Sequence, residues 1–308
     1  MLFRSTPDGT IYTIAGSGAY GSGGDGGPAS GAGFEFPLGI ALGPNGAVYV
    51  SDTGNNEIRM LTPVPAINHA QSVSSCGAFT SVSPGAWVEI YGSNLATSAY
   101  LWTSGDFTGN TAPTSLAGTG VSIGGQTAVV AYVSSGQVNA QVPLGVPTGS
   151  QSITVKDING TTAAYTITVN ATQPGLCQGA SLGGVQYLAA VLADGSAYVL
   201  PAGANIGAPV RPAHPGEIIT FFGNGFGPVS PSAVQGQVVQ QQNQLTNQFQ
   251  ILFGQTAATI KYAGLAPDAV GLYQFNVVVP SVPANNAVPI TFTLGGVAGT
   301  QKLFTAVQ

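Results

Sequence analysis

The chain has 308 residues, of which only 6% are charged, and a formal net charge of −5. Its six lysines and arginines are too few to neutralise a nucleic-acid backbone or an anionic lipid surface, so we expect no nucleic-acid partner. The sequence has no run of 18 or more apolar residues, so we also expect no membrane insertion.

Four ordered motifs lie between residues 8 and 59: DGTIYTIAG from Asp8, GDGGPA from Gly24, FPLGIAL from Phe36 and VYVSDTGNNEIR from Val48. Their apolar strands and the DTGNN turn, in this order, resemble the NHL repeat, which is a blade of a β-propeller. The resemblance implies that residues 1–65 hold one blade and the last strand of a preceding blade. A closed propeller generally needs four to eight blades, so this blade would leave strand edges and an apolar face uncovered.

Such a blade must pack on the next domain, pair with another chain, or belong to a longer protein. The first residues, Met-Leu-Phe-Arg-Ser, lack the apolar segment of a secretory signal peptide. This favours the third alternative, in which the chain is the final part of a longer NHL-propeller protein.

Gly16 to Gly21 fit the spacing G-x-G-x-x-G of a dinucleotide-binding turn. That turn must open a helix whose N-terminus faces the pyrophosphate. Here Gly21 is followed by SGGDGGPASG, which contains too much glycine to begin a helix. We therefore interpret residues 16–27 as a flexible connection between blades, and we expect no cofactor.

Asp52, Asn55, Asn56 and Glu57 place oxygen ligands close together, as a calcium site requires. Asp and Asn also shape tight turns through local hydrogen bonds and left-handed backbone. The turn is the preferred interpretation, and we expect no metal site.

The remaining sequence consists of short β-branched runs, each bounded by Gly, Pro, Asn or Asp, and contains no convincing amphipathic helix. The best helical candidate, Gln235 to Gln250, follows neither the helical nor the strand period. The sequence therefore predicts an all-β protein. The clearest strands are residues 47–50, 87–91, 128–133, 152–155, 165–169, 218–222 and 289–294.

An internal repeat organises this part of the chain. SPGAWVEIYGSNL from Ser83 returns as HPGEIITFFGNGF from His214, GQTA from Gly125 returns from Gly254, and QVNAQVP from Gln137 returns as QFNVVVP from Gln274. Each copy has the size and strand number of an immunoglobulin-like sandwich. We predict two tandem β-sandwiches, at residues 66–174 and 175–308, after the partial propeller blade at 1–65.

These landmarks resemble the IPT/TIG branch of immunoglobulin-like domains. More narrowly, the pair is similar to the C-terminal domain of unknown function that follows NHL propellers in large bacterial secreted proteins. The resemblance implies an extracellular or cell-surface protein without catalytic activity.

Cys76 and Cys177 are the two cysteines of the chain. A secreted protein would join them in a disulfide that clamps the two sandwiches together, and the alternative is two buried free thiols. For a closed loop of about 100 residues, the chain-entropy model gives roughly 4 to 5 kcal/mol of stabilisation, less any strain.

The catalytic candidates are weak. Ser122 and Ser181 lie in G-x-S-x-G patterns, but the chain has only His69 and His214 to act as the base, and neither is expected to meet a serine. Glu89 and Glu217 could form an acid pair for glycoside hydrolysis, yet they fall in separate domains. We expect no catalytic residues.

Tyr100, Trp102 and Phe107 fall in a polar, glycine-rich loop, where they could contact a ligand such as a glycan. Trp87 and Tyr91 share strand parity, and we expect both to fill the core of the first sandwich.

Together these patterns favour a non-catalytic interaction or scaffold module whose partner is a protein or a surface glycan. One alternative is a structural subunit that self-assembles into a homo-oligomer or filament through uncovered edges. Another is the carbohydrate-binding appendage of a polysaccharide-degrading system.

Overall fold

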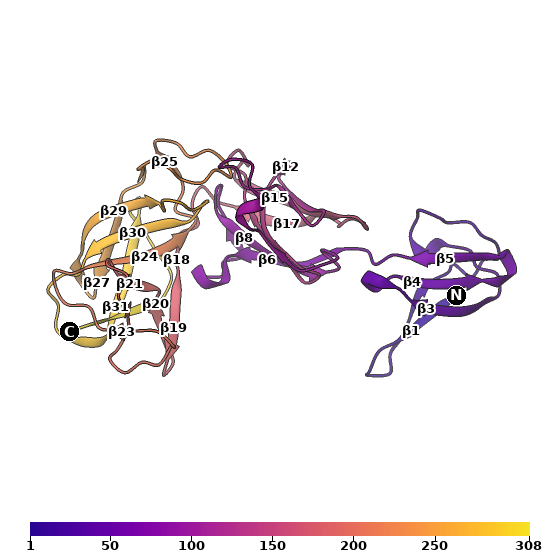
Figure 1. Cartoon of the computed structure of the whole chain (residues 1–308), viewed down its shortest axis with the longest axis horizontal. Coiled ribbons are helices and arrows are strands. Elements are labelled where there is room, and N and C mark those ends of the chain that lie inside the picture. The colour runs from indigo at the N-terminus through magenta and orange to yellow at the C-terminus, as the bar shows by residue number, and fades with distance from the viewer. The chain divides into compact units, whose positions relative to one another are not determined.

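The computed structural model describes residues 1–308, except for the side chain of Asn45. The chain is all-β, as predicted, and its described residues form strands and short 3-10 turns only (Figure 1). It divides into two compact units, Met1–Val64 and Pro65–Gln308. Among the described residues, no helix is long and apolar enough to cross a membrane.

The first unit has a two-stranded and a three-stranded antiparallel sheet. In the larger sheet the central strand pairs with both neighbours, so the other two strands are edges. The smaller sheet is β1 (Leu2–Ser5) and β2 (Ile11–Ala15), and the larger is β3 (Pro37–Leu42), β4 (Val48–Asp52) and β5 (Glu57–Leu61). The 3-10 turns are η1 (Ala29–Gly31), η2 (Pro44–Gly46) and η3 (Thr53–Asn55).

Arg59 holds the glycine-rich connection between β2 and β3 against the larger sheet. Its Nη1 donates to the Gly33 carbonyl at 2.7 Å, its Nη2 donates to the carboxylate of Asp25, and its guanidinium lies 5.0 Å from the centre of the Phe34 ring. A carbonyl of the loop, not a row of N–H groups, therefore faces the guanidinium. The G-x-G-x-x-G spacing of residues 16–21 lies in this loop, and in the described chain the next element after it is the short turn η1 rather than an α-helix.

The Asp52 side chain organises the turn that was also considered for calcium. It is fully buried and accepts hydrogen bonds from the Glu35 N–H at 2.7 Å and from Asn55 Nδ2 at 2.8 Å. Asn56 follows η3 with a left-handed φ of 56°. The side chains thus shape the turn, and no group of three or more His, Cys, Asp or Glu residues in the described part of the chain could hold a metal ion.

We expect Arg59→Met to lower the free energy of unfolding of the first unit by about 3 kcal/mol, because it leaves the buried Asp52 carboxylate without its cation. Hydrogen exchange of peptides from residues 11–61 measures this opening. Arg4→Met, at an exposed position in β1, is the matched control. Equal protection in the two variants would contradict the role of Arg59.

The second unit contains two pairs of facing sheets, each with its own core. One sheet of the first pair has the order β6 (Ala66–Ser72), β8 (Trp87–Ser93), β14 (Gln137–Gln141), β13 (Val129–Val133), β9 (Tyr100–Leu101). The facing sheet has the order β10 (Ser115–Leu116), β11 (Thr119–Ile123), β15 (Gly149–Asp157), β17 (Tyr165–Val169), β7 (Ser81–Val82), with β12 (Gln126–Thr127) and β16 (Gly160–Thr161) at its sides. The turn η4 (Ser74–Cys76) lies between β6 and β7 in sequence, and η5 (Ser104–Asp106) lies between β9 and β10.

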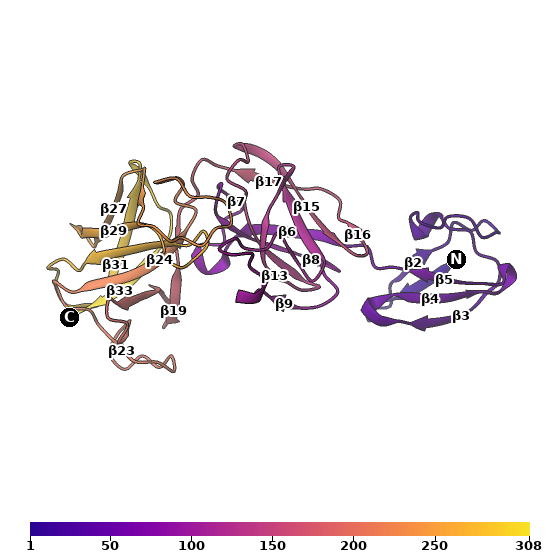
Figure 2. The same cartoon turned by 45° about the horizontal axis from the view of Figure 1, so that its top comes forward.

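The second pair follows the first along the chain (Figure 2). One sheet has the order β23 (Val210–Arg211), β22 (Tyr198–Val199), β21 (Ala190–Leu192), β24 (Ile218–Asn224), β30 (Tyr273–Val278), β29 (Thr259–Leu265), with β18 (Gly175–Leu176) on β24. Its partner has the order β19 (Gln178–Leu182), β20 (Val185–Leu188), β33 (Leu303–Val307), β31 (Asn285–Leu294), β27 (Phe249–Phe253), β28 (Thr256–Ala257), with β32 (Val297–Ala298) on β31. The strands β25 (Val229–Ser230) and β26 (Gln244–Leu245) pair with each other in a separate antiparallel sheet. The boundary between the two sandwiches at residues 174–175 stays a prediction.

The repeated sequence landmarks occupy equivalent places in the two sandwiches. β8 lies between β6 and β14, and β24 lies between β21 and β30. The next strands, β13 and β29, each have a register shift, between Val130 and Tyr132 and between Ile260 and Tyr262. The internal repeat is therefore a repeat of structure down to the position of a bulge.

Local turn chemistry explains the short hairpins at the sandwich edges. Gly124 and Gly125 connect β11 to β12 with φ of 57° and 76°. Two consecutive positive φ values define the type I′ turn, which matches the twist of a two-residue hairpin. The same Gly-Gly pair connects β19 to β20 and β31 to β32.

The prediction that Trp87 and Tyr91 fill the core of the first sandwich is wrong. The fully buried residues of β8 are Val88 and Ile90, and Trp87 and Tyr91 are only half-buried on the opposite face. Parity correctly placed the two aromatic residues on one face. It could not show which face meets the facing sheet, because both faces of β8 carry large apolar side chains.

Candidate ligand-binding cavity

The buried side chain of Asn224 is one of several contacts that join the two sandwiches. Asn224, at the end of β24, accepts a hydrogen bond from the Trp87 N–H at 2.8 Å and donates one to the Trp87 carbonyl at 3.0 Å. Trp87 in turn donates from its indole Nε1 to the Val270 carbonyl at 2.8 Å. β8 of the first sandwich is thereby held at both backbone and side chain by the second.

Other contacts close the same junction. Cys76 and Cys177 form a disulfide, which joins η4 to the segment between β18 and β19. Ser83 Oγ donates to the Gly225 carbonyl at 3.2 Å, and Gln178 Nε2 donates to the Ser74 carbonyl at 3.0 Å. The disulfide and these hydrogen bonds fix the position of one sandwich relative to the other.

Of the three aromatic residues expected to contact a ligand, Trp102 and Phe107 pack in this junction, and none of the three lines the cavity described below. Trp102 packs edge-on against Trp87, with ring centres 5.4 Å apart, and lies 5.1 Å from Phe107. These rings pack with Val270 and Val238 of the second sandwich. Tyr100 remains more exposed, and its hydroxyl donates to Asp106 at 3.2 Å. Ligand contact by Tyr100, Trp102 and Phe107 stays a prediction.

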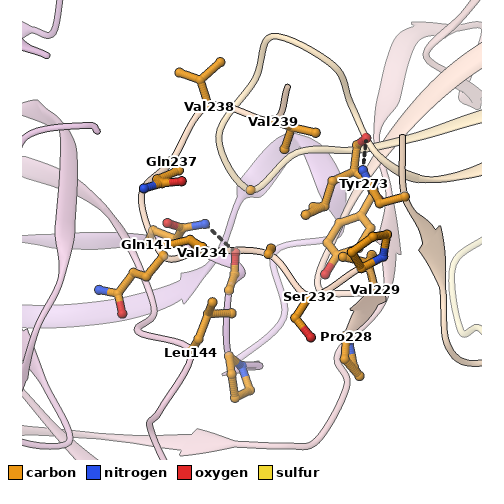
Figure 3. A pocket seen from close by; sticks show the side chains of 18 of the residues that line it. Gln141, Leu144, Pro228, Val229, Ser232, Val234, Gln237, Val238, Val239 and Tyr273 are labelled. Carbon is orange, nitrogen blue, oxygen red and sulfur yellow. Dashed lines mark hydrogen bonds between the residues drawn. The ribbon is translucent and has the colours of Figure 1, made fainter. Parts of the chain in front are cut away.

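A cavity of about 790 Å³ lies between the sandwiches, within the size range of small-molecule sites (Figure 3). Gln141 and Leu144 line it from the first sandwich, and Val229, Val234 and Tyr273 line it from the second. Most of the remaining wall comes from residues 227–241, which run from the end of β24 toward β26.

The described lining of this cavity contains no Asp, Glu, Lys, Arg or His. Nine of its described lining residues are proline, valine or leucine, and seven are glutamine or asparagine. The one titratable group is the Tyr273 phenol, which donates to the Gly227 carbonyl. Burial raises the pKa of Tyr273 well above its usual range, so this group is neutral at physiological pH. An ionic ligand would find no counter-charge here.

Gln141 is the unusual polar group of the wall. It is only 4% exposed, and its Nε2 donates to the Gly85 carbonyl at 3.0 Å. Its Oε1 has no hydrogen-bond partner, a property it shares among the described side chains with only the Thr119 and Thr305 hydroxyls. Neither threonine lines the cavity. A buried acceptor without a donor destabilises the protein by about 1–3 kcal/mol.

The sequence-level catalytic candidates are not brought together. His69 forms a hydrogen bond with Gln71 and its ring stacks on Tyr91, whereas His214 forms a hydrogen bond with the Gln308 carbonyl. No hydrogen bond between the described residues joins either histidine to Ser122 or Ser181.

The two candidate carboxylates are engaged in structural contacts. Glu217 is held by both Nη atoms of Arg211, at 2.9 and 2.7 Å, and this hydrogen bonding lowers the pKa of the Glu217 carboxyl. Glu89 accepts from the Ser74 N–H at 3.0 Å and from the Tyr91 hydroxyl at 2.8 Å. Burial, together with the smaller effect of the contact with Glu89, raises the pKa of Tyr91 to about 12. Neither carboxylate lines the cavity.

Comparison with known protein families finds one match in this chain. The NHL repeat model matches residues 34–59, so this segment of the chain is an NHL repeat. No curated protein sequence matches the chain. The resemblance of the sandwiches to IPT/TIG domains stays a prediction.

Solved structures show distant similarity. The SGBP-B protein of the Bacteroides ovatus mixed-linkage glucan utilization locus, in complex with a heptasaccharide, is 14% identical with a TM-score of 0.32, and the match covers 85% of this chain and 52% of that one. The S-layer protein SbsC, domains 5–6, is 14% identical with a TM-score of 0.23, over 79% of this chain and 98% of that one. The chain thus spans about half the length of the SGBP-B protein. TM-scores this low carry no argument for fold or ligand.

The cavity was missed at the sequence level. Its main wall, residues 227–241, overlaps the glutamine-rich stretch that we considered as the best helical candidate. The signal was the absence of any period in a segment rich in Pro, Val and Gln, which is typical of a long loop.

We expect Asn224→Ala to lower the free energy of unfolding of the second unit by about 3 kcal/mol, because it leaves the Trp87 N–H and carbonyl without these partners. Urea denaturation followed by tryptophan fluorescence measures this directly, since both tryptophans lie at the junction. Asn205→Ala, at an exposed loop position, is the control. A change below about 0.5 kcal/mol for Asn224→Ala would show that the bridge is dispensable.

Proposed function

We propose that this chain is a non-catalytic, extracellular binding module whose ligand occupies the cavity between the two sandwiches. The observation that carries the proposal is the cavity itself, which is of ligand size and has walls from both sandwiches. The disulfide is consistent with an oxidising, extracellular location.

The composition of the wall supports binding without catalysis. Ser232 is the hydroxyl nucleophile among the described lining residues, and the lining contains no histidine or carboxylate that could activate it. The wall instead provides apolar surface and amide groups, which bind and orient a ligand. In this proposal the fixed junction keeps the cavity open in the absence of ligand, so little ordering accompanies binding.

We expect Val234→Trp to weaken ligand binding by obstructing part of the cavity. Val234 lines the cavity and is 60% exposed, so the larger side chain can be accommodated without disturbing a core. The measurement is a thermal-shift screen of neutral small molecules together with a glycan array, in which each ligand is also recovered and checked for chemical change by mass spectrometry.

Val297→Trp is the matched control, because Val297 is 72% exposed and lies on β32, away from the cavity lining. Ligands that bind both variants as they bind the wild type would place the binding site elsewhere. A ligand converted to product would contradict the non-catalytic assignment.

Self-assembly is a second candidate function, and the first unit provides a specific observation for it. Leu38, Ile40 and Leu42 belong to the edge strand β3 and are 79%, 61% and 84% exposed. Ile58 and Met60 are exposed on β5. An edge strand with apolar side chains is a template for pairing, and here the proposed partner is a second copy of the chain.

In this case we expect the wild type to associate as its concentration rises and Leu42→Lys to reduce the association at least tenfold, because a charge on the edge strand opposes pairing. Sedimentation velocity measures the change. Ile158→Lys, at a position that is 83% exposed in the second unit, is the control. A wild type that is monomeric at high concentration would exclude self-assembly.

A further inference from the structure

The internal repeat preserves a group of side chains as well as the order of strands. In the sheets that contain β8 and β24, a Gln-x-Asn pair lies on the interior strand β14 or β30. An aromatic residue is paired with the Gln from one neighbouring strand, and a tyrosine is paired with the Asn from the other. The first group consists of Tyr91, Gln137, Asn139 and Tyr132, and the second of Phe222, Gln274, Asn276 and Tyr262.

We propose that the two groups are equivalent binding sites for a neutral polysaccharide, each of which takes one segment of the polymer. Two equivalent sites on one chain suit a ligand of repeating units, because each site can take the same unit and simultaneous contact increases the overall affinity. None of the eight residues belongs to the described lining of the cavity, so these sites lie outside the one in the proposed function.

Both groups lie on the outer face of their sheet. Residues two apart on a strand, and residues paired across antiparallel strands, point to the same side of a sheet. Val138 and Phe275, which lie between the Gln and the Asn in each copy, are fully buried in the two cores, so the amides and rings point away from these cores. All eight side chains are half-buried, which leaves part of each accessible.

The amides present the same atoms in both copies. Gln137 Nε2 donates to Asn139 Oδ1 at 2.7 Å, and Gln274 Nε2 donates to Asn276 Oδ1 at 3.0 Å. The remaining atoms of each pair, the Asn Nδ2 and the Gln Oε1, have no hydrogen-bond partner in the described chain, and none is among its buried unpartnered atoms. Each group therefore offers solvent one N–H donor group and one acceptor oxygen.

This chemistry fits a sugar. A hydroxyl group both donates and accepts hydrogen bonds, so neighbouring sugar hydroxyls can match the amide N–H and the amide oxygen. The adjacent rings offer apolar surface for the C–H groups of the sugar ring. The strands that carry the amides are interior, so their backbone is already paired and an extended peptide cannot add to the sheet there.

The neutral character follows from a comparison of the two groups. The bulge beside the tyrosine holds Ala131 in the first copy and the exposed Lys261 in the second. The residue paired with the Asn on its other side is Glu89 in the first copy and Thr220 in the second. Glu89 is only 6% exposed and is hydrogen-bonded within the protein. The two copies share no charge, so a ligand that binds both cannot depend on an ionic group.

The test measures binding of the full chain to immobilised polysaccharides by biolayer interferometry. Starch, a galactomannan and hydroxyethyl cellulose are the neutral probes, and polygalacturonate is the acidic probe. The variants are Asn139→Leu, Asn276→Leu and the double variant, since leucine is similar in size and cannot donate. Gln250→Leu, at an exposed position on β27 in the opposite sheet of the second sandwich, is the matched control. Gln137→Leu with Gln274→Leu removes the acceptors and is the second double variant, and thermal denaturation checks that each protein is folded.

We expect at least one neutral polysaccharide to bind the wild type and Gln250→Leu equally, and polygalacturonate to bind both more weakly. Each single variant should bind the neutral polymer about tenfold more weakly, because one of two sites is lost, and either folded double variant should not bind it. Absence of binding by every neutral probe, tighter binding of polygalacturonate, or folded double variants that bind as the wild type would overturn the proposal. Loss of binding in Asn139→Leu with no change in Asn276→Leu would overturn the equivalence of the two groups.

Val234→Trp separates this inference from the proposed function. We expect it to bind the neutral polymer as the wild type does. If Val234→Trp weakens that binding and the double variants do not, the polysaccharide occupies the cavity, which overturns this inference and supports the proposed function.

Discussion

The geometry of the second unit depends on the two hydrogen bonds by which Asn224 holds the backbone of Trp87. They connect the start of β8, an interior strand of one sandwich, to the end of β24, an interior strand of the other. Gly225 follows with a φ of 79°, and a Cβ at this position would lie 2.2 Å from the Gln173 carbonyl oxygen. The chain can therefore approach this closely only with glycine there. Without this junction, the cavity would have no fixed second wall.

A chain with few charges must stabilise such a junction by other means. The described contacts here are amide-to-backbone hydrogen bonds, ring packing and one disulfide, whose 101-residue separation stabilises the native state by roughly 4 to 5 kcal/mol in the chain-entropy model. These interactions depend little on salt, because they involve no exposed ion pair. The same scarcity of charge is seen in the described lining of the cavity, which contains no Asp, Glu, Lys, Arg or His.

In the first unit, the side chain of Arg59, one of the few cations of the chain, holds a loop against the sheet. Arg59 is buried against Asp52 and Phe34 and holds the glycine-rich loop by the carbonyl of Gly33. Val50 lies in a small core, whereas Ile40 and Leu42, which pair with Val50 and Val48 from the edge strand β3, are exposed. The NHL repeat thus folds as a sheet whose apolar surface exceeds what its own chain buries, which is the physical basis of the self-assembly alternative.

The sequence by itself determined the all-β class, the NHL repeat and the repeat of the two sandwiches, because alternation, glycine turns and recurring landmarks such as GQTA are local in the chain. Only the tertiary structure decided which face of β8 is core, where Trp102 and Phe107 pack, and that a cavity lies beside Gln141. These features depend on contacts between segments more than 100 residues apart, such as Trp87 with Val270 and Asn224. No local pattern encodes such contacts, since a strand with apolar residues on both faces is equally suited to a core or to an interface.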